Sequence, residues 1–420
     1  MSGNPSARCA GMKDFYSAQR NMTMLICVLG RQPDLGAAEL EALFGHDGAR
    51  RVSRECMTIR EGDAPALQRR LGGTIKIGEV VLTIPSSRMN RIYSATRGEI
   101  IRYVLEGPDA ARRKVSIGIS AYGMRVSPGQ IYRLLFDIRR HLLEEGRQVR
   151  VVSGGETALG SAKIIHEGLV GGKGHEFLLV GAGRETYLAR TVSIQDIEGY
   201  AKRDYGRPRR DTRTGMLPPK LAQMMLNLAG AGPGRTVVDP FCGTGVVLME
   251  AALMRSRLAG GDIRQQMVDC TVENLQWLSR EFGISADTRG IVRADATVHR
   301  WRQHLDCVVS ETHLGRPLAY VPSEETLRAS VIECDRLVAR FLANLQPQLD
   351  AGSRCCIAVP AWNLPRGMVH LPVLHRLESM GYRCISFRNA GQGGLVYLRP
   401  GQIVARELLV LATDGNARRR

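Results

Sequence analysis

The segment VVDPFCGTG at 237–245 combines an acidic residue at the end of an apolar run with two glycines, and a helical pattern follows it. Gly243 and Gly245 lack a Cβ, so the backbone can turn sharply there and approach a ligand closely. Amide donors then gather at the N-terminus of the next helix. The segment fits neither GxxxxGK[ST] nor GxGxxG, the patterns of phosphate-binding loops. The carboxylate of Asp239 instead favours a cationic or amino-bearing ligand such as S-adenosylmethionine, which carries a sulfonium and an α-amino group.

Acidic residues also end the next two predicted strands. Asp262 closes LAGGD, about 20 residues after Asp239, which is the usual spacing for a carboxylate that binds ribose hydroxyls. Ile263 would lie against the adenine, and Asp295 in GIVRADAT could accept the adenine amino group. Because parallel strands present their carboxyl ends at one edge of a sheet, the three aspartates predict one ligand site.

A fourth predicted strand, LDCVVS at 305–310, leads into a loop that starts with Glu311, Thr312, His313 and Leu314. This loop faces the reactive end of the ligand across the switch point of the sheet. The Glu311 carboxylate and the Thr312 carbonyl could accept the two hydrogens of a substrate amino group, and His313 could relay a released proton. This loop is therefore the candidate catalytic segment beside the ligand.

DPFCGTG followed by Glu250-Ala251 resembles the first methyltransferase motif of amino-methylating RNA enzymes, especially the tRNA guanosine N2-methyltransferases that carry a THUMP domain. The segments 71–80, 193–230 and 397–411 agree with this resemblance, which spans roughly residues 22–411. It implies that S-adenosylmethionine donates a methyl group to the exocyclic N2 of a guanosine in tRNA, near nucleotide 10. The cofactor-binding residues that follow from the motifs and the resemblance are Pro218, Asp239, Phe241, Cys242, Gly243, Gly245, Asp262, Ile263, Asp295, Ala296 and Ser310.

The fourth motif departs from the pattern of the family, which normally places Asp-Pro-Pro-Tyr at these positions. Glu311 keeps the carboxylate with one extra methylene, whereas Thr312 and His313 replace the prolines and Leu314 replaces the aromatic residue. Loss of a stacking ring would cost ~1 to 3 kcal/mol of base binding unless another residue, such as Tyr320, stacks instead. The intact cofactor motifs favour a working enzyme with a divergent loop, and residues 311–314 are its predicted catalytic residues.

The composition of the chain indicates which kinds of partner it could bind. The chain has 420 residues, enough for two or three domains, and a net charge of +17, which favours a polyanionic partner. Residues 1–210 hold 33 Lys and Arg against 22 Asp and Glu, so the first half is the expected RNA platform. The ten cysteines include no CxxC pair, which predicts no metal site and no disulfide framework. No apolar run approaches the ~20 residues of a membrane helix, and we expect a soluble, cytoplasmic protein.

The amino-acid composition changes most sharply at a basic stretch, residues 200–213. It interleaves tyrosines and a proline with cationic residues, a mixture suited to RNA backbone and stacking contacts but also to a solvated hinge. The predicted RNA-binding residues in it are Lys202, Arg203, Tyr205, Arg207, Arg209 and Arg210.

The order of predicted strands and helices indicates an α/β protein with a Rossmann-like, seven-stranded methyltransferase domain in its second half. Short alternating elements precede it and resemble the N-terminal ferredoxin-like and THUMP regions of the family. The expected organisation is a flexible extension at 1–21, a ferredoxin-like domain at 22–85, a THUMP domain at 86–198, a basic linker at 199–215, the methyltransferase domain at 216–413 and a basic tail at 414–420.

Two other functions fit the same residues. The chain could be an amino-methyltransferase that acts on DNA or ribosomal RNA, or a catalytically impaired RNA-binding protein with a vestigial methyltransferase fold. A small activating subunit or a homo-oligomer is compatible with either.

Overall fold

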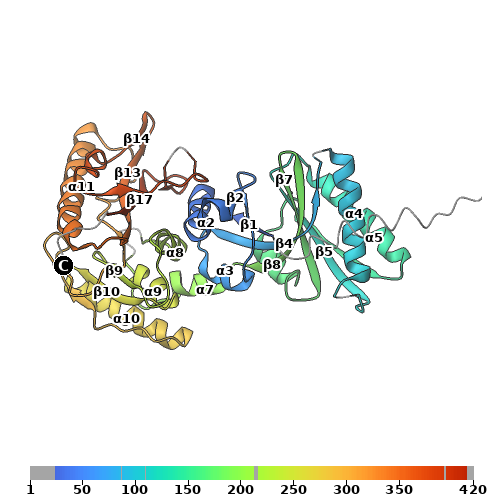
Figure 1. Cartoon of the computed structure of the whole chain (residues 1–420), viewed down its shortest axis with the longest axis horizontal. Helices are drawn as coiled ribbons and strands as arrows, with labels where there is room; N and C mark the ends of the chain where they lie inside the picture. The colour runs from blue at the N-terminus through green and yellow to red at the C-terminus, as the bar shows by residue number, and fades with distance from the viewer. Residues whose placement is uncertain (1–23, 87, 109, 212–215, 392–393, 414–420) are drawn as a thin grey trace, which may run out of the picture. The chain divides into compact units, whose positions relative to one another are not determined.

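The computed structural model describes residues 24–86, 88–108, 110–211, 216–391 and 394–413, so the predicted extension at 1–21 and tail at 414–420 lie outside the described residues. The chain folds into two compact units (Figure 1). Unit 1 comprises Met1–Gly30, Asp47–Arg69 and Thr74–Gln195, and unit 2 comprises Arg31–His46, Arg70–Gly73 and Asp196–Arg420.

Unit 1 is built on a mixed eight-stranded sheet with the order β2-β3-β1-β4-β8-β7-β5-β6. Strand β5 pairs in parallel with β6 and β7, and the other neighbours pair antiparallel. The strands are β1 Leu25–Leu29, β2 Ala49–Arg51, β3 Cys56–Ile59, β4 Thr74–Ile84, β5 Lys114–Tyr122, β6 Gln148–Val152, β7 Gly174–Ala182 and β8 Glu185–Ile194. The helices along this part of the chain are α3 Ala64–Arg70, α4 Met89–Glu106, α5 Pro128–Glu144 and α6 Ser161–His166.

Helix α5 shows why these sequences fold as they do. The Ser127 hydroxyl accepts the Gln130 amide and the Gln130 side chain accepts the Ser127 amide, so the two residues form a capping box. Apolar residues then recur at helical spacing and pack with those of α4 on one face of the sheet, against side chains such as Ile117 and Phe177. The interior of unit 1 is therefore a sheet with two long helices on the same face.

Unit 2 contains a second sheet with the order β11-β10-β9-β12-β13-β17-β15. Its first five strands run parallel, and β17 is antiparallel to both β13 and β15. This confirms the expected parallel sheet that ends in an antiparallel strand. The strands are β9 Thr236–Asp239, β10 Arg257–Asp262, β11 Ile291–Arg293, β12 Cys307–Glu311, β13 Arg354–Leu364, β15 Arg383–Cys384 and β17 Val404–Ala412, with β14 Gly367–Val369 on β13 and β16 Val396–Tyr397 on β17.

Helices cover both faces of this sheet. Helices α8 (Pro219–Leu228), α9 (Val246–Leu253) and α10 (Gln265–Phe282) contribute to one apolar core, and α11 (Glu324–Leu345) contributes to the other. Alternate strand residues serve the two cores: Val237 lies in the first and Val238 in the second, as the pleat requires. Short 3₁₀ helices at Gln346–Gln348 and Pro372–Arg376 complete the unit.

The N-terminal segment divides between the two units. Helix α2 (Pro33–Gly48) belongs mostly to unit 2, where Leu35 and Ala38 share an apolar core with α8. The fully buried carboxylate of Glu39 accepts the amides of Gly72 and Gly73 and the side-chain amide of Asn227 at 2.7 to 2.9 Å. A segment that starts near the N-terminus is thus part of the unit that holds the glycine turn.

The basic stretch also has more regular structure than its composition indicates. Helix α7 (Ile197–Ala201) continues directly into a π-helical turn at Lys202–Gly206. None of the described helices is both long and apolar enough to cross a membrane.

Candidate active site

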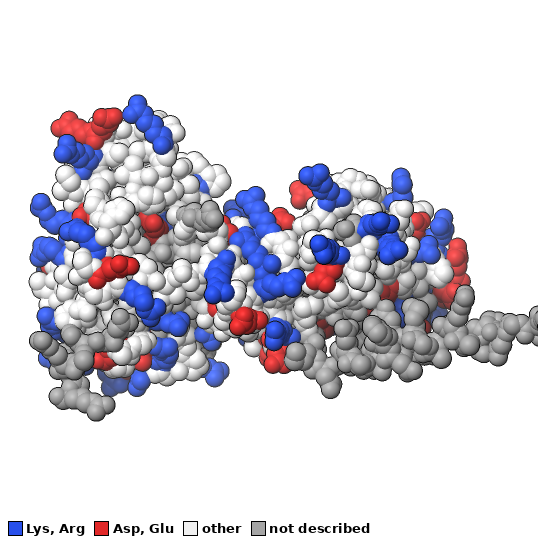
Figure 2. Space-filling view, turned by 45° about the horizontal axis from the view of Figure 1, so that its top comes forward, with Lys and Arg blue, Asp and Glu red and all other residues white. Residues whose placement is uncertain are grey.

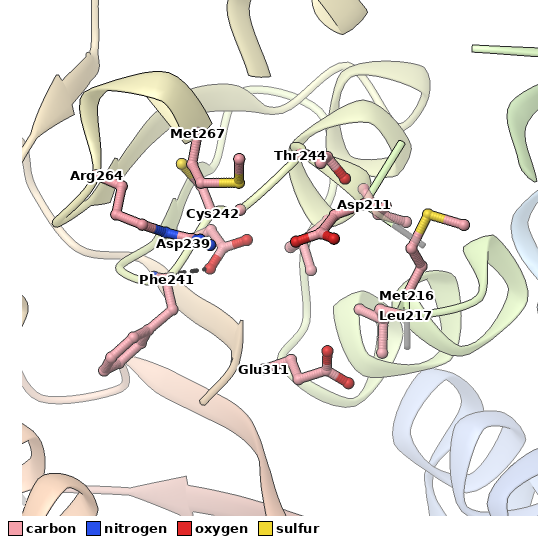
Figure 3. Close-up of a pocket in the computed structure, with 13 residues that line it drawn as sticks. Asp211, Met216, Leu217, Asp239, Phe241, Cys242, Thr244, Arg264, Met267 and Glu311 are labelled. Atoms are coloured by element: carbon pink, nitrogen blue, oxygen red, sulfur yellow. Dashed lines mark hydrogen bonds between the residues drawn. The ribbon is translucent and has the colours of Figure 1, made fainter. Parts of the chain in front are cut away.

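A pocket opens at the carboxyl ends of β9 and β12, where the strand order of unit 2 reverses (Figure 3). Its empty space amounts to about 530 Å³ and includes open solvent. The residues that line it are Asp211, Met216, Leu217, Asp239, Phe241, Cys242, Gly243, Thr244, Val246, Val247, Arg264, Met267 and Glu311. The position agrees with the rule that ligands of open α/β sheets bind at the switch point.

The glycine turn needs its glycines. Gly243 and Gly245 have φ of 51° and 85°, in the left-handed region that side chains with a Cβ rarely adopt. A Cβ on Gly245 would also lie 2.9 Å from Cγ2 of Thr271 on α10. The Thr271 hydroxyl donates to the Gly243 carbonyl at 2.9 Å, so α10 holds the turn from behind.

Asp239 is the buried acid of the pocket, and 2% of it is exposed. Its Oδ1 accepts the Ser310 hydroxyl at 2.5 Å and the Phe241 amide at 3.2 Å. Burial raises the pKa of Asp239 to about 7, although the hydrogen bond from Ser310 opposes the rise. Ser310 is fully buried and does not line the pocket; its hydroxyl contacts Asp239 and accepts the Phe241 amide at 3.2 Å.

Glu311 ends β12 and lines the opposite part of the pocket. Its Oε1 accepts a short hydrogen bond from Nε of Arg406 on β17, which is itself buried. Burial raises the pKa of Glu311, and the Arg406 guanidinium opposes that rise. Figure 3 shows the carboxylates of Asp211, Asp239 and Glu311 around one hollow, with the Arg264 side chain at its edge. The lining therefore favours a cationic ligand.

The other predicted cofactor residues do not line the pocket. Asp262 accepts the amides of Arg264 at 2.9 Å and Gly243 at 3.2 Å, and Ile263 beside it is 61% exposed. Asp295 accepts the amide and hydroxyl of Thr297, each at 2.8 Å, and these hydrogen bonds lower its pKa. The last two, Pro218 at the N-cap of α8 and Ala296, are buried. Asp239, Phe241, Cys242, Gly243 and Glu311 are the predicted residues that meet in the pocket, and Gly245 starts the helix behind them.

The loop after Glu311 turns away from the pocket. Thr312 is buried, and both its amide and its hydroxyl donate to the Ala358 carbonyl, at 2.9 and 3.2 Å. His313 is 48% exposed in its side chain and lies 3.8 Å from Glu333 on α11. Neither His313 nor Leu314 lines the pocket, so of the four predicted catalytic residues only Glu311 does.

Two of the predicted RNA-binding residues are buried, and the structure corrects that part of the prediction. Arg203 is 7% exposed and Arg207 is 2% exposed. The Nε atom of Arg203 donates to the buried Glu250 at 2.6 Å, and its guanidinium lies 4.5 Å from the ring centroid of Tyr200. Arg203 thus ties the basic stretch to α9, which carries Glu250, whereas Arg207 donates to the Arg203 carbonyl at 2.9 Å.

The other four predicted RNA-binding residues are exposed. Lys202 and Arg209 pair at the surface with Glu281 and Glu273, each at 2.7 Å. Tyr205 is 67% exposed, and the Arg210 guanidinium lies 5.3 Å from the centroid of its ring. Lys and Arg side chains also outnumber Asp and Glu on the face of the molecule in Figure 2. Among the described residues, no three His, Cys, Asp or Glu side chains gather as a metal site.

Sequence reasoning missed several residues that shape the pocket. Asp211 lines it although it belongs to the predicted linker, Met216 is the first residue of the predicted methyltransferase domain, and Arg264 lies two residues after the predicted Asp262. Arg406 carried no local signal, because it lies 95 residues from its partner Glu311. The βαβ pattern could have directed attention to Arg264 and Met267, which open the helix after the second strand.

Comparison with known proteins points to methyltransferases. Residues 207–316 match the family model described as RMKL-like, methyltransferase domain. The chain is 36% identical over 146 residues to the tRNA (guanine(10)-N2)-dimethyltransferase of Methanothermobacter thermautotrophicus and 39% identical over 92 residues to that of Methanocaldococcus jannaschii. The matches cover 35% and 21% of this chain but only 39% and 25% of those relatives.

A solved structure shows the fold over a longer range. TrmN from Thermus thermophilus is 18% identical, and the alignment covers 93% of this chain and 99% of TrmN with a TM-score of 0.52. The chain thus contains a methyltransferase-type domain of α/β fold. Within that class, the resemblance to tRNA guanosine N2-methyltransferases is confirmed by the relatives that it matches.

Proposed function

We propose that this chain is an S-adenosylmethionine-dependent methyltransferase that modifies the exocyclic N2 of a guanosine in tRNA, near nucleotide 10. The observation that carries the proposal is the pocket at the switch point of unit 2, where Asp239 and Glu311 lie on neighbouring strands. The relatives named as tRNA (guanine(10)-N2)-dimethyltransferases supply the substrate class.

The residues of the pocket fit the cofactor. S-adenosylmethionine supplies an electrophilic methyl group on a positively charged sulfonium and also carries an α-amino group. Three carboxylates against one guanidinium among the lining residues suit such a ligand. Asp239 and the glycine turn would bind it, with Phe241, Cys242 and Met267 packing around it. Asp262, Ile263, Asp295 and Ala296 would contact the nucleoside part from the neighbouring strand ends, and Pro218 would support Leu217 at the wall.

Glu311 is the residue that acts on the substrate. The lone pair of the guanine amino group is delocalised into the ring, so the nitrogen must be held in line with the methyl group and its hydrogens must be drawn to acceptors. Glu311 supplies a carboxylate at the pocket edge for one hydrogen. Thr312, His313 and Leu314 do not line the pocket, so we assign the role in transfer to Glu311 alone.

The rest of the chain would bind the tRNA. We assign the ferredoxin-like and THUMP regions together to unit 1, whose strands share one sheet, and the methyltransferase domain to unit 2, which includes α2 and the basic stretch. The excess of cationic residues in the first half supports an RNA platform there, through contacts to phosphates. Tyr205, Arg209 and Arg210, which are exposed in the basic stretch, would also contact RNA. A cytoplasmic enzyme with tRNA as its partner follows from these assignments.

The test is the substitution Glu311→Gln, which keeps the shape of the side chain but removes its charge. Affinities for S-adenosylhomocysteine and tRNA should stay within a few-fold, whereas methyl transfer should fall roughly 10²-fold or more, the scale of losing one well-placed polar group. Transfer is measured with labelled cofactor and the product identified by mass spectrometry of tRNA nucleosides. Glu324→Gln, at a 98% exposed side chain at the start of α11, is the matched control. Transfer at the normal rate by the Glu311 variant would show that this carboxylate is not catalytic.

The loop at 311–314 favours one other candidate, an RNA-binding protein without transfer activity, because Leu314 cannot stack on a base. That candidate requires tRNA binding by the intact chain with no methylated guanosine in the product. Transfer to DNA or ribosomal RNA in place of tRNA would identify a different amino-methyltransferase.

A further inference from the structure

Arg406 is a buried cation beside the pocket. It lies on β17, where 5% of the residue is exposed, and it pairs across the sheet with Pro360 of β13. On the other side of β13, Ala358 pairs with Glu311. The Arg406 side chain therefore reaches over β13, and its Nε donates to Oε1 of Glu311. An arginine is costly to bury unless a carboxylate compensates for its lost hydration.

The environment of Glu311 explains what this contact does. Arg406 from β17 contacts it directly, and the other charged residues that line the same pocket are Asp239 from β9, Asp211 from the basic stretch and Arg264 from the start of α10. Two of the four are acidic, and the Glu311 side chain is only 20% exposed. Without the guanidinium, burial and like charge would both favour a protonated glutamate. A protonated carboxyl group has lost the charge that draws a substrate hydrogen.

The contact also orients the carboxylate. Oε1 accepts a hydrogen bond from Arg406, and Oε2 has no hydrogen-bond donor among the described residues. An aspartate at 311 would be one methylene shorter, so it would either leave the guanidinium or withdraw from the pocket. The extra methylene of Glu311 thus allows its carboxylate to reach the pocket and the buried Arg406 at the same time.

We propose that Arg406 is a positioning residue for methyl transfer, which holds the Glu311 carboxylate ionised at the pocket edge with one oxygen left for the substrate amino group. The inference rests on the proposed function, since it assigns a role within that reaction. Arg406 itself touches neither cofactor nor substrate in this role.

The neighbouring residue on β17 provides a matched control. Glu407 contacts His370, with 2.7 Å between Oε2 and Nδ1, and is not among the residues that line the pocket. Replacement of Glu407 by glutamine removes a carboxylate from the same strand without touching Glu311. A general weakening of β17 would affect both variants, whereas loss of the positioning contact would affect only Arg406→Gln.

The experiment compares the full-length protein with its Arg406→Gln, Arg406→Lys and Glu407→Gln variants. The first readout is the ratio of the affinities for S-adenosylmethionine and S-adenosylhomocysteine, measured by calorimetry from pH 5.5 to 9. Both ligands carry the α-amino group, so titration of Asp239 affects them alike, whereas the sulfonium alone responds to the charge of Glu311. The second readout is the pH profile of methyl transfer.

We expect the midpoint of both profiles to move upward by about one pH unit or more in Arg406→Gln. A carboxylate pKa typically rises by this amount when a nearby positive charge is lost. Transfer at neutral pH should fall about 10- to 100-fold and recover partly at alkaline pH. Arg406→Lys keeps the charge and should lie between this variant and the wild type, so it carries the test if Arg406→Gln does not fold. Glu407→Gln should match the wild type.

Two outcomes separate this inference from the proposed function. Wild-type midpoints and rates in both Arg406 variants would overturn the positioning role while tRNA methylation stands. The other outcome is that the wild-type protein methylates no tRNA while the affinity ratio still shifts in Arg406→Gln. This result would overturn the proposed function, and the effect of Arg406 on the charge of Glu311 would stand.

Discussion

At the scale of single residues, the pocket depends on how two carboxylates are held. Asp239 is buried beneath the glycine turn with a hydroxyl and an amide as donors, and Glu311 faces it with a guanidinium as its donor. The same burial that makes ionisation costly makes each charge strong once a cationic ligand is present, because the local dielectric is low. Binding of a cationic ligand should therefore favour the ionised forms of Asp239 and Glu311.

The first consequence concerns the pH dependence of cofactor binding. The pKa of Asp239 is raised to about 7 in the ligand-free protein, and a cationic amino group favours its ionised form. Affinity for S-adenosylhomocysteine should therefore be constant above about pH 8 and fall about tenfold per unit as the pH drops below about 7. Calorimetry from pH 5.5 to 8.5 measures this.

Ser310→Ala is the companion variant for that measurement. Loss of the hydroxyl donor raises the pKa of Asp239 further, so the break in the affinity profile should move to higher pH. An affinity that does not change between pH 5.5 and 8 in the wild type would show that Asp239 does not bind the amino group.

At the scale of secondary-structure elements, α10 joins the glycine turn to the basic stretch. The side chain of Asn274 is buried on this helix, and its amide nitrogen donates to the carbonyls of Thr244 at 2.8 Å and Arg209 at 2.9 Å. Its oxygen accepts the Arg209 amide at 2.9 Å. One side chain thus satisfies backbone groups of two segments, and Thr244 lines the pocket.

Asn274→Ala should leave these backbone groups without partners. Each buried unsatisfied group costs about 1 to 3 kcal/mol, so we expect the free energy of unfolding to fall by at least about 2 kcal/mol. Cofactor affinity should also fall, by about tenfold, because the turn loses its support. Denaturant unfolding and calorimetry measure the two effects.

Glu273→Gln, one residue earlier on α10, is the control. It removes only the exposed ion pair with Arg209, which is worth about 0 to 1 kcal/mol. Equal losses in the two variants would mean that Asn274 contributes no more than a surface contact.

At the scale of the whole molecule, the unit that holds the pocket is assembled from three separate parts of the chain. Helix α2 supplies Glu39 and the apolar side chains beside α8, and Arg203 supplies the partner of the buried Glu250. The sequence boundaries of the methyltransferase domain, 216–413, omit both. A fragment with those boundaries would expose part of a core and leave a buried carboxylate uncompensated.

We therefore expect the fragment 216–413 to lack a cooperative unfolding transition, because loss of the partner of a buried charge alone costs about 3 to 5 kcal/mol. Circular dichroism during heating, with the full-length chain as reference, measures this. The variant Arg203→Met in the full-length chain isolates the contribution of Glu250. A fragment that unfolds as sharply and at the same temperature as the full chain would show that α2 and α7 add nothing to the stability of unit 2.

Local sequence was sufficient to predict the glycine turn, the parallel sheet with its antiparallel end, and the acidic residues at the strand ends. These features depend on short-range properties: the missing Cβ of Gly243 and Gly245, the apolar runs of the strands, and the residues that close them. The cationic ligand followed from Asp239 alone, because a carboxylate beside a glycine turn disfavours phosphate.

The contacts that complete the site could not be predicted in this way, because they join residues that are distant in the sequence. Arg406 meets Glu311 across 95 residues, and Arg203 meets Glu250 across 47. Composition treats every arginine of the basic stretch as a surface cation, yet packing buries Arg203 and Arg207 and exposes Arg210. Only the tertiary structure decides which charge lies in water and which is paired inside, since the cost of burial depends on the partner that the fold supplies.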